Sequence, residues 1–276
     1  MRVRCRVMTV TLRPFSSSED YRACVELQRV TWGRDFSDVV PLSILKINQK
    51  VGGVAAGAFA ADGRLLGFVW GMTGLRDGKP FHWSHMLAVT PAARDLKLGE
   101  RLKWFQRELL LPLGVEEVEW TYDPLEARNA HLNLNKLGAE VKEYVEDMYA
   151  GEMGSELARG IGSDRFIVRW RIASPRAEAA RSGHLAGTDL TAFASAPILG
   201  VETAEAALGL PTSPHVRIEI PADIQAVKNE NPGLAAAWRQ STRRAFLHYF
   251  ERGYRVTAYL RDAPTGGRRF YGLSAT

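Results

Sequence analysis

The chain has 276 residues, of which 46% are apolar and 24% charged, and its formal net charge is +5. This composition is ordinary for a globular protein, and no segment offers the roughly 20 apolar residues that span a bilayer. The basic start lacks the apolar stretch of a signal peptide, and the two cysteines have no metal-ligand spacing. We therefore expect a cytoplasmic protein with no membrane partner and no bound metal.

The pattern of apolar residues predicts short strands that alternate with amphipathic helices. The expected elements are a strand at 7–15, helices at 16–32 and 41–53, two strands within 54–74, a strand at 79–91, a helix at 98–111, a strand at 115–124, a helix at 125–138 and strands at 140–149 and 164–172. A serine at or beside Ser18 can cap the first helix. This order predicts a mixed α/β (α+β) fold.

The strand at 79–91 carries two histidines, and its side chains are expected to alternate between the two faces of the sheet. One predicted face holds His82, Ser84, Met86 and Ala88, and the other holds Trp83, His85, Leu87 and Val89. The two histidines are therefore expected to point in opposite directions.

After Ile172 the composition changes to Ala, Ser and Gly, which indicates a linker over 173–214. Order returns over 215–276 as a strand, a long helix and two closing strands. The same strand–helix–strand–strand order occurs at 115–172, so we interpret 215–276 as a half-copy of that segment. The predicted division is 1–172, 173–214 and 215–276.

The stretch "PAARDLKLGERLKWFQ", residues 91–106, places basic residues at the start of a helix. The first turn of a helix leaves backbone N–H groups unpaired and carries a partial positive charge, so it can hold a phosphate. Gly99 allows a ligand to approach the backbone closely, and Arg94, Lys97 and Arg101 add charge. By itself the stretch is better interpreted as a solvated basic helix start without a ligand, since one glycine is weak evidence.

The order of elements over 1–172, together with "MLAVTPAARDLKLGERLK" at 86–103, resembles the GNAT family of acyl-CoA N-acyltransferases. The strand end Leu87-Ala88-Val89, then Arg94 and Gly99, follow the family's motif, whereas Lys97 replaces its central glycine. The resemblance implies a mixed, mainly antiparallel sheet with helices on both faces, and acetyl-CoA or succinyl-CoA as acyl donor. The implied donor-binding residues are Leu87, Ala88, Val89, Arg94, Asp95, Leu96, Lys97, Leu98, Gly99, Glu100, Arg101, Asn129 and Asn133.

A second motif, "EARNAHLNLNKLGA" at 126–139, resembles the family's helix that ends in Lys-Leu-Gly. The family's tyrosine, a frequent general acid, falls here on Leu134. "SHMLAV", "WTYDPLEARNAHLN", "SDRFIVRW" and "AWRQSTRRAFLHYFERGY" resemble a narrower group of larger bacterial GNAT proteins. That resemblance implies, as one candidate, N-succinyl transfer to amino acids. The acceptor is thus a small amine, with an amino acid as one candidate, and a homodimer stays open.

The catalytic candidates are His85, Asn129 and Tyr149. An imidazole has a suitable pKa for a general base, although a core histidine is an equal alternative for His85. Asparagines are unfavourable inside a helix, so Asn129 and, less strongly, Asn133 indicate contacts with ligand. Tyr149 is a candidate acid, although a structural position in the core or at its rim is the first interpretation.

Other polar residues have structural roles as their first interpretation. Glu119 is expected to be a solvated strand residue, and Asp123 to cap the next helix. Arg165 and Arg128 are candidate partners for a carboxylate, with an ion pair to Asp164 as the simpler role for Arg165.

Two other functions compete with the enzyme. A catalytically inactive acyl-CoA-binding module is the first alternative, because Lys97 and Leu134 depart from the motifs. The positive charge also attracts nucleic acid in principle. However, the basic residues form no long run and no aromatics interleave with them, so we expect no nucleic-acid partner.

Overall fold

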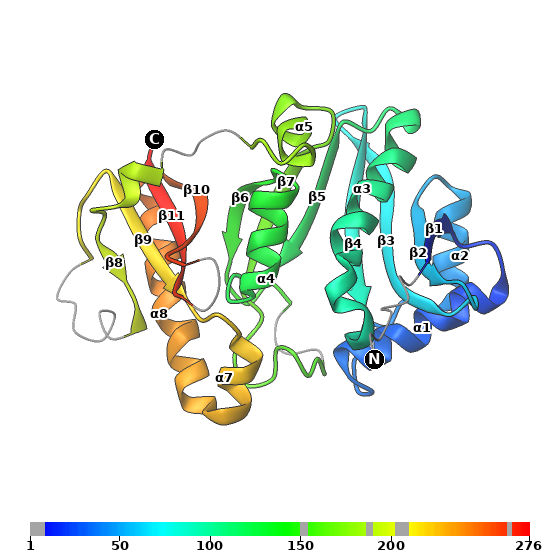
Figure 1. The fold of residues 1–276 in the computed structure, drawn as a ribbon, viewed down its shortest axis with the longest axis horizontal. Coiled ribbons are helices and arrows are strands. Elements are labelled where there is room, and N and C mark those ends of the chain that lie inside the picture. Colours follow the sequence, from blue (N-terminus) through cyan, green and yellow to red (C-terminus); the bar gives the residue numbers. More distant parts are fainter. Residues whose placement is uncertain (1–8, 150–153, 186–189, 202–209, 264–266) are drawn as a thin grey trace, which may run out of the picture. The chain divides into compact units, whose positions relative to one another are not determined.

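The computed structural model describes residues 9–149, 154–185, 190–201, 210–263 and 267–276 (Figure 1). By its internal contacts the chain divides into two compact units, Met1–Val118 and Glu119–Thr276. Each unit contains several strands and helices, and the two are described separately.

The first unit is built on four strands in the order β1-β2-β3-β4, in which each neighbouring pair is antiparallel. Its elements are β1 (Val10–Pro14), α1 (Ser18–Trp32), α2 (Leu42–Lys50), β2 (Val54–Ala60), β3 (Leu65–Arg76), β4 (Lys79–Val89) and α3 (Leu98–Leu110). The predicted order of elements is confirmed, and so is a mixed α/β fold with a mainly antiparallel sheet.

Helices cover both faces of this sheet. Gly67 and Phe68 are consecutive in β3, so they face opposite sides. A side chain at Gly67 would touch Leu102 of α3, whereas the ring of Phe68 lies 6.4 Å from that of Trp32 in α1. The prediction of helices on both faces is therefore confirmed in this unit.

A capping box starts α1 and ties it to β1. Ser17, rather than Ser18, is the cap: its hydroxyl accepts from the backbone N–H of Asp20, and the Asp20 carboxylate accepts from that of Ser17. The same carboxylate lies 2.6 Å from a guanidinium nitrogen of Arg13 on β1. The hydrogen bond from Arg13 lowers the pKa of Asp20 to about 2.

A β-bulge interrupts β4 in its centre. Trp70 pairs with Met86, and two residues further along β3 Met72 pairs with Trp83. Between these two pairs, β4 therefore spans three residues where β3 spans two. The extra residue inverts the alternation of side chains and disrupts the ladder locally.

The bulge overturns the side-chain alternation predicted for β4. Because directly opposed residues share a face, Met86 and Ala88 lie on the face of Trp83, and His82 lies on the other. The inversion falls at Ser84 and His85. The predicted sets are therefore wrong for the residues after the bulge: Met86 and Ala88 do not share the face of His82, and Leu87 and Val89 do not share that of Trp83. His82 and Ser84 do share a face, since both contact Gln106 of α3.

The second unit contains two groups of strands, in the orders β5-β7-β6 and β10-β11-β9-β8. Its elements are β5 (Glu117–Tyr122), α4 (Ala127–Ala130) with a π-helical turn (His131–Lys136), β6 (Glu140–Val145), β7 (Arg165–Arg171), α5 (Pro175–Arg181), β8 (Ile198–Leu199), β9 (His215–Ile220), α7 (Ile224–Glu230), α8 (Pro232–Glu251), β10 (Tyr254–Arg261) and β11 (Arg269–Ala275).

The segment 215–276 has the strand order of the segment before it. In both, the first strand is followed in space by the third and then by the second: β5-β7-β6 and β9-β11-β10. The last two strands are antiparallel in each case, and Figure 1 shows α8 against the second group. This order is what a half-copy requires.

The segment 173–214 is not a bare linker. It contains α5, and β8 pairs with β9 in parallel, Ile198 opposite Arg217. Its Ala-rich composition hid these elements, since α5 has only two turns and β8 only two residues. The division into 1–172, 173–214 and 215–276 stays a prediction.

Gly138 tests how tightly the turn before β6 is packed. Its φ is +68°, and a Cβ atom there would lie 2.9 Å from the Arg176 carbonyl oxygen. We expect Gly138→Ala to lower the free energy of unfolding by about 2–3 kcal/mol, measured with urea. Gly160→Ala is the matched control, since its φ is +75° with open space around it, and we expect about 1 kcal/mol. Equal losses would contradict the steric clash.

Candidate active site

In the first unit, the loop after β4 leaves the N-terminus of α3 without a side-chain cap. Pro91–Leu96 forms a 3₁₀-helix, and Lys97 then takes the left-handed conformation, with φ 53° and ψ 30°. Lys97 is the residue before α3, and its side chain accepts no hydrogen bond from the helix. The first backbone N–H groups of α3 therefore have no partner within the helix.

The conformation of Lys97 explains the motif. Glycine occupies the left-handed region without strain, whereas other residues do so at a cost. Lys97 thus sits where the related motif has glycine because the backbone there has a positive φ. The lysine keeps the bend and adds a cation beside the start of α3.

The sequence-predicted donor residues of this unit are contiguous. Arg94, Lys97 and Arg101 are exposed, and a nitrogen of Arg101 donates to the Val10 carbonyl oxygen at 3.3 Å. The remaining ones are exposed Asp95, half-buried Leu96, Gly99 and Glu100, and buried Leu98. Leu87, Ala88 and Val89 end β4, opposite Val69, Phe68 and Gly67 of β3.

His85 lies at the bulge and is half-buried. Its ring meets the ring of Trp70 edge-on, with 5.5 Å between centroids. Burial lowers the pKa of His85, and the charge of Asp38, in the loop between α1 and α2, opposes that shift in part. The imidazole is therefore neutral at pH 7, the state in which it can accept a proton.

His82 belongs to a buried polar network between β4 and α3. One ring nitrogen lies 2.8 Å from the Thr73 hydroxyl, and the other lies 3.0 Å from the side-chain nitrogen of Gln106. The Gln106 oxygen accepts from Ser84, and the Lys103 ammonium donates to Ser84 at 2.8 Å. His82 is thus a core histidine with partners.

Lys103 was missed in the sequence because it falls in an ordinary amphipathic helix. It is buried, and burial lowers its pKa well below the usual value. Its position in the helix did not indicate burial, since a lysine one position after Leu102 normally reaches solvent.

In the second unit, the asparagine-rich helix changes from α to π geometry. The N–H of Leu137 donates to the Leu132 carbonyl, five residues earlier. Asn129 is exposed on the first turn, whereas Asn133 is buried and accepts from the indole of Trp120 at 3.3 Å. Asn129 is therefore free to reach a ligand, and Asn133 holds the helix against β5.

Leu134 and Tyr149 occupy different surroundings. Leu134 is buried in the helix. Tyr149 is half-buried, its hydroxyl lies 2.9 Å from that of Thr121, and the Arg165 guanidinium lies 5.3 Å from its ring centroid. Arg128 is exposed on α4.

Two acidic residues have roles that the sequence did not give. Asp123 does not cap α4, whose N-cap position is Glu126; one oxygen accepts from the Leu125 N–H, and the other lies 2.5 Å from Arg239 on α8. Glu119 is only 1% exposed and forms an ion pair with Lys142 at 2.9 Å. Both expectations were wrong because the partners are distant in sequence.

Asp164 is the most completely enclosed carboxylate of this group, with an exposed fraction of 0%. Two nitrogens of Arg243 donate to it, at 2.5 and 2.9 Å, and so does the Tyr144 hydroxyl. Burial opposes the charge, but the hydrogen bonds from Arg243 and Tyr144 outweigh it and hold the pKa of Asp164 below its usual value. Arg165 instead donates to the Asp164 carbonyl oxygen, at 2.8 Å, and one of its nitrogens lies 3.7 Å from Asp123.

Across the described ranges, no group of three or more metal-ligating side chains comes together. Nor does any helix within those ranges have the length and apolar character needed to cross a bilayer.

Comparison with known proteins gives similarity to solved structures only. No protein-family model and no curated protein matches the chain. A chain of the NatC complex bound to Gag peptide and CoA is similar, with a TM-score of 0.48 and 11% identity over 59% of this chain and 99% of that one. A GNAT superfamily phosphinothricin acetyltransferase from Sinorhizobium meliloti in complex with AcCoA is also similar. Its TM-score is 0.45, with 16% identity over 59% of this chain and 88% of that one.

The ribosomal-protein-S18-alanine N-acetyltransferase from Escherichia coli is similar as well, with a TM-score of 0.45 and 15% identity over 66% of this chain and 98% of that one. At such identities and scores, these similarities do not by themselves assign an activity to this chain.

Asp164→Asn tests the buried ion pair. The pKa of Asp164 is lower in the folded than in the unfolded chain, so its stabilising effect is present above the unfolded value, about 4, and is lost as the pH falls. We expect a loss of about 3 kcal/mol at pH 7 by urea unfolding, and a smaller difference at pH 3.

Asp62→Asn is the control, since Asp62 forms an exposed pair with Arg64. That substitution should leave the free energy of unfolding at pH 7 almost unchanged, because an exposed ion pair contributes little. A loss at Asp164 that stays the same at both pH values would contradict the assignment.

Proposed function

We propose that the protein is an acyl-CoA-dependent N-acyltransferase, in which an amine attacks the donor thioester directly. The observation that carries the proposal is the uncapped start of α3, held open by Lys97 in the left-handed conformation directly after the bulged strand β4. A helix start with free N–H groups and added cations is a site for a phosphate.

The donor-side roles follow from this geometry. The N–H groups at the start of α3 would bind the pyrophosphate of coenzyme A, with Arg94, Lys97 and Arg101 around them. The end of β4, Leu87–Val89, would bind the pantetheine arm through its backbone. The donor supplies the activated acyl group as a thioester.

We assign the chemical roles to three residues. His85, neutral at pH 7, would accept the proton of the attacking amine, directly or through water. Asn129 is exposed and has no side-chain hydrogen bond to another described residue, so it would bind the donor or the acceptor. Tyr149 would donate a proton to the leaving thiolate.

The acyl group and the acceptor are the finer part of the proposal. Acetyl and succinyl groups are the two candidates, and the acceptor is a small amine, with an amino acid as one class. A catalytically inactive acyl-CoA-binding module is the second candidate, and the burial of Leu134, where the related motif has tyrosine, favours it.

Thiol release separates the two candidates. The full chain is incubated with acetyl-CoA or succinyl-CoA and a panel of amines, including amino acids, while free thiol is followed. Amine-dependent release of CoA supports the enzyme. Tight CoA binding without turnover on any amine would instead support the module.

His85→Ala should lower turnover by about 10²–10⁴-fold and leave CoA affinity near that of the unaltered chain, because a base acts on the acceptor. Since the pKa of His85 is lowered, the unaltered enzyme should keep its rate as the pH falls to about 6.5 and lose it below that value. His184→Ala, at an exposed position, is the control. Unchanged turnover in His85→Ala would remove His85 from the mechanism.

Lys97→Gly should separate backbone shape from charge. Glycine adopts a φ of 53° without strain, so the loop keeps its bend while one cation is lost. We expect thermal stability to be equal or higher and the Kd for CoA to rise about threefold to tenfold, measured by calorimetry at low salt. Arg64→Ala, in the β2–β3 turn, controls for net charge. An unchanged Kd would exclude Lys97 from the phosphate site.

A further inference from the structure

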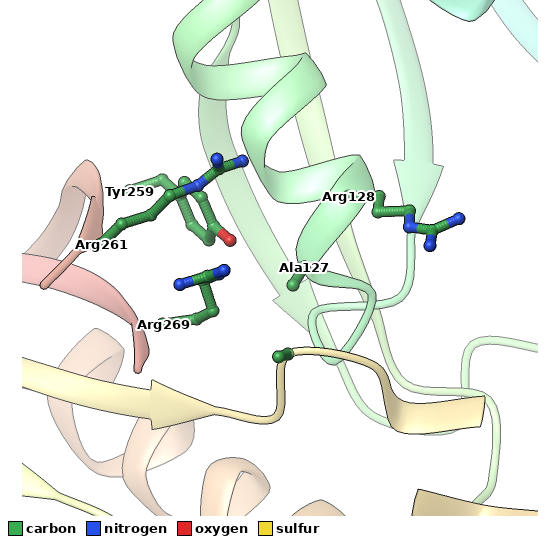
Figure 2. A pocket seen from close by; sticks show the side chains of 6 residues that line it. Ala127, Arg128, Tyr259, Arg261 and Arg269 are labelled. Carbon is green, nitrogen blue, oxygen red and sulfur yellow. The ribbon is translucent and has the colours of Figure 1, made fainter. Parts of the chain in front are cut away.

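A pocket of about 260 Å³ lies in the second unit, among β10, β11, the start of α4 and the segment after β9. Its lining residues are Ala127, Arg128, Ala222, Tyr259, Arg261 and Arg269 (Figure 2). Figure 2 shows the guanidinium groups of Arg261 and Arg269 on one side of α4 with the Tyr259 hydroxyl, whereas Arg128 points away from them. The small volume suits a ligand below drug size.

Two arginines face each other across the strands that line this pocket. Arg261 of β10 is the direct partner of Arg269 of β11 in the antiparallel ladder. Directly opposed like charges destabilise a sheet. Within the described ranges, neither arginine forms an ion pair with a carboxylate; the side chain of Arg269 donates only to the carbonyl oxygens of Gly267 and Arg268.

Three carboxylates on the neighbouring strand and the adjoining segments bind other groups. Glu219 on β9 binds Arg268 through two hydrogen bonds, at 2.5 and 2.7 Å. Asp262 accepts from the backbone N–H of Arg268, and Asp223 caps α7. The positive charge of the pocket is therefore left for a ligand.

A buried hydroxyl points to the same conclusion. Tyr259 is only 4% exposed, and its hydroxyl makes no hydrogen bond of ordinary geometry with any described residue. Burial raises its pKa, and the charge and weak contact of the nearby Arg261 guanidinium oppose that shift in part. A buried hydroxyl without a partner costs free energy. The neighbouring His131 shows the positive field: burial and the charges of Arg261, Lys136 and Arg269 lower its pKa to about 4.

We propose that this pocket binds the phosphate group of a small phosphorylated molecule, held by Arg261, Arg269 and the Tyr259 hydroxyl. A phosphate monoester carries about two negative charges at pH 7, which match the two guanidinium groups. Arginine donates in the fork geometry that phosphate oxygens accept, and Tyr259 gains the partner that it lacks. The pocket does not depend on the acyl-transfer reaction.

Thermal unfolding of the full chain tests the site with inorganic phosphate, succinate and acetate at equal ionic strength. Phosphate should raise the Tm by about 5 °C at saturation and acetate should not. A larger shift with succinate than with phosphate, or equal shifts with all three anions, would overturn the assignment.

Matched variants locate the effect. Arg261→Gln and Arg269→Gln should each raise the Tm of the free protein by a few degrees, because they remove the repulsion, and abolish the phosphate shift. Tyr259→Phe should keep the fold and weaken phosphate binding about tenfold. Arg255→Gln, exposed on the same strand β10, should leave the phosphate shift intact. A shift that survives in the first two variants would sink the proposal.

Coenzyme A distinguishes two sources of the phosphate. The phosphate shift should persist when CoA is saturating, and the CoA affinity of Arg261→Gln should equal that of the unaltered chain. Loss of the phosphate shift with CoA present would overturn a separate site and assign the two arginines to the donor. If the chain did not bind CoA at all, the proposed function would fail. The phosphate-induced Tm shift and its loss in Arg261→Gln and Arg269→Gln would still test this site.

Discussion

A buried carboxylate is the constraint on which the second unit depends. Asp164 is fully enclosed, so its charge requires partners, and α8 provides them through Arg243. One helical turn earlier, Arg239 binds Asp123 and the Ile161 carbonyl oxygen. The segment 215–276 is thereby joined to the strands that precede it. Removing Asp123 would leave Arg239, which is only 4% exposed, without its carboxylate partner.

In the first unit, two departures from regular geometry place the chemistry. The left-handed Lys97 leaves the N–H groups of α3 open to an anion, and the bulge in β4 moves His85 beside Trp70. Both have a cost, since the left-handed region is strained for lysine and a bulge disrupts the ladder. Strained positions that persist in an otherwise regular fold are typical of functional sites. In the proposed function, the loop at Lys97 therefore binds the donor, and strand β4 carries the reactive residue His85.

Much of the fold follows from local patterns, and much of the site does not. Periodicity gave the strands and helices of the first 172 residues in their observed order, and the start of α3 at Leu98. It failed at β4, because one inserted residue has no signature in a strand whose two faces are both covered. It also missed the buried Lys103 and the π-helical turn, since both depend on packing against another element.

By itself, the sequence determined the order of elements, the glycine-ended turns and the basic start of α3, because propensity, capping and backbone conformation act over a few residues. The tertiary structure decided which polar groups meet. It separated Asn133, which binds Trp120, from exposed Asn129, and it brought Arg261 opposite Arg269. Such pairings join residues on different helices and strands, and their free energy depends on burial, which no short stretch of sequence encodes.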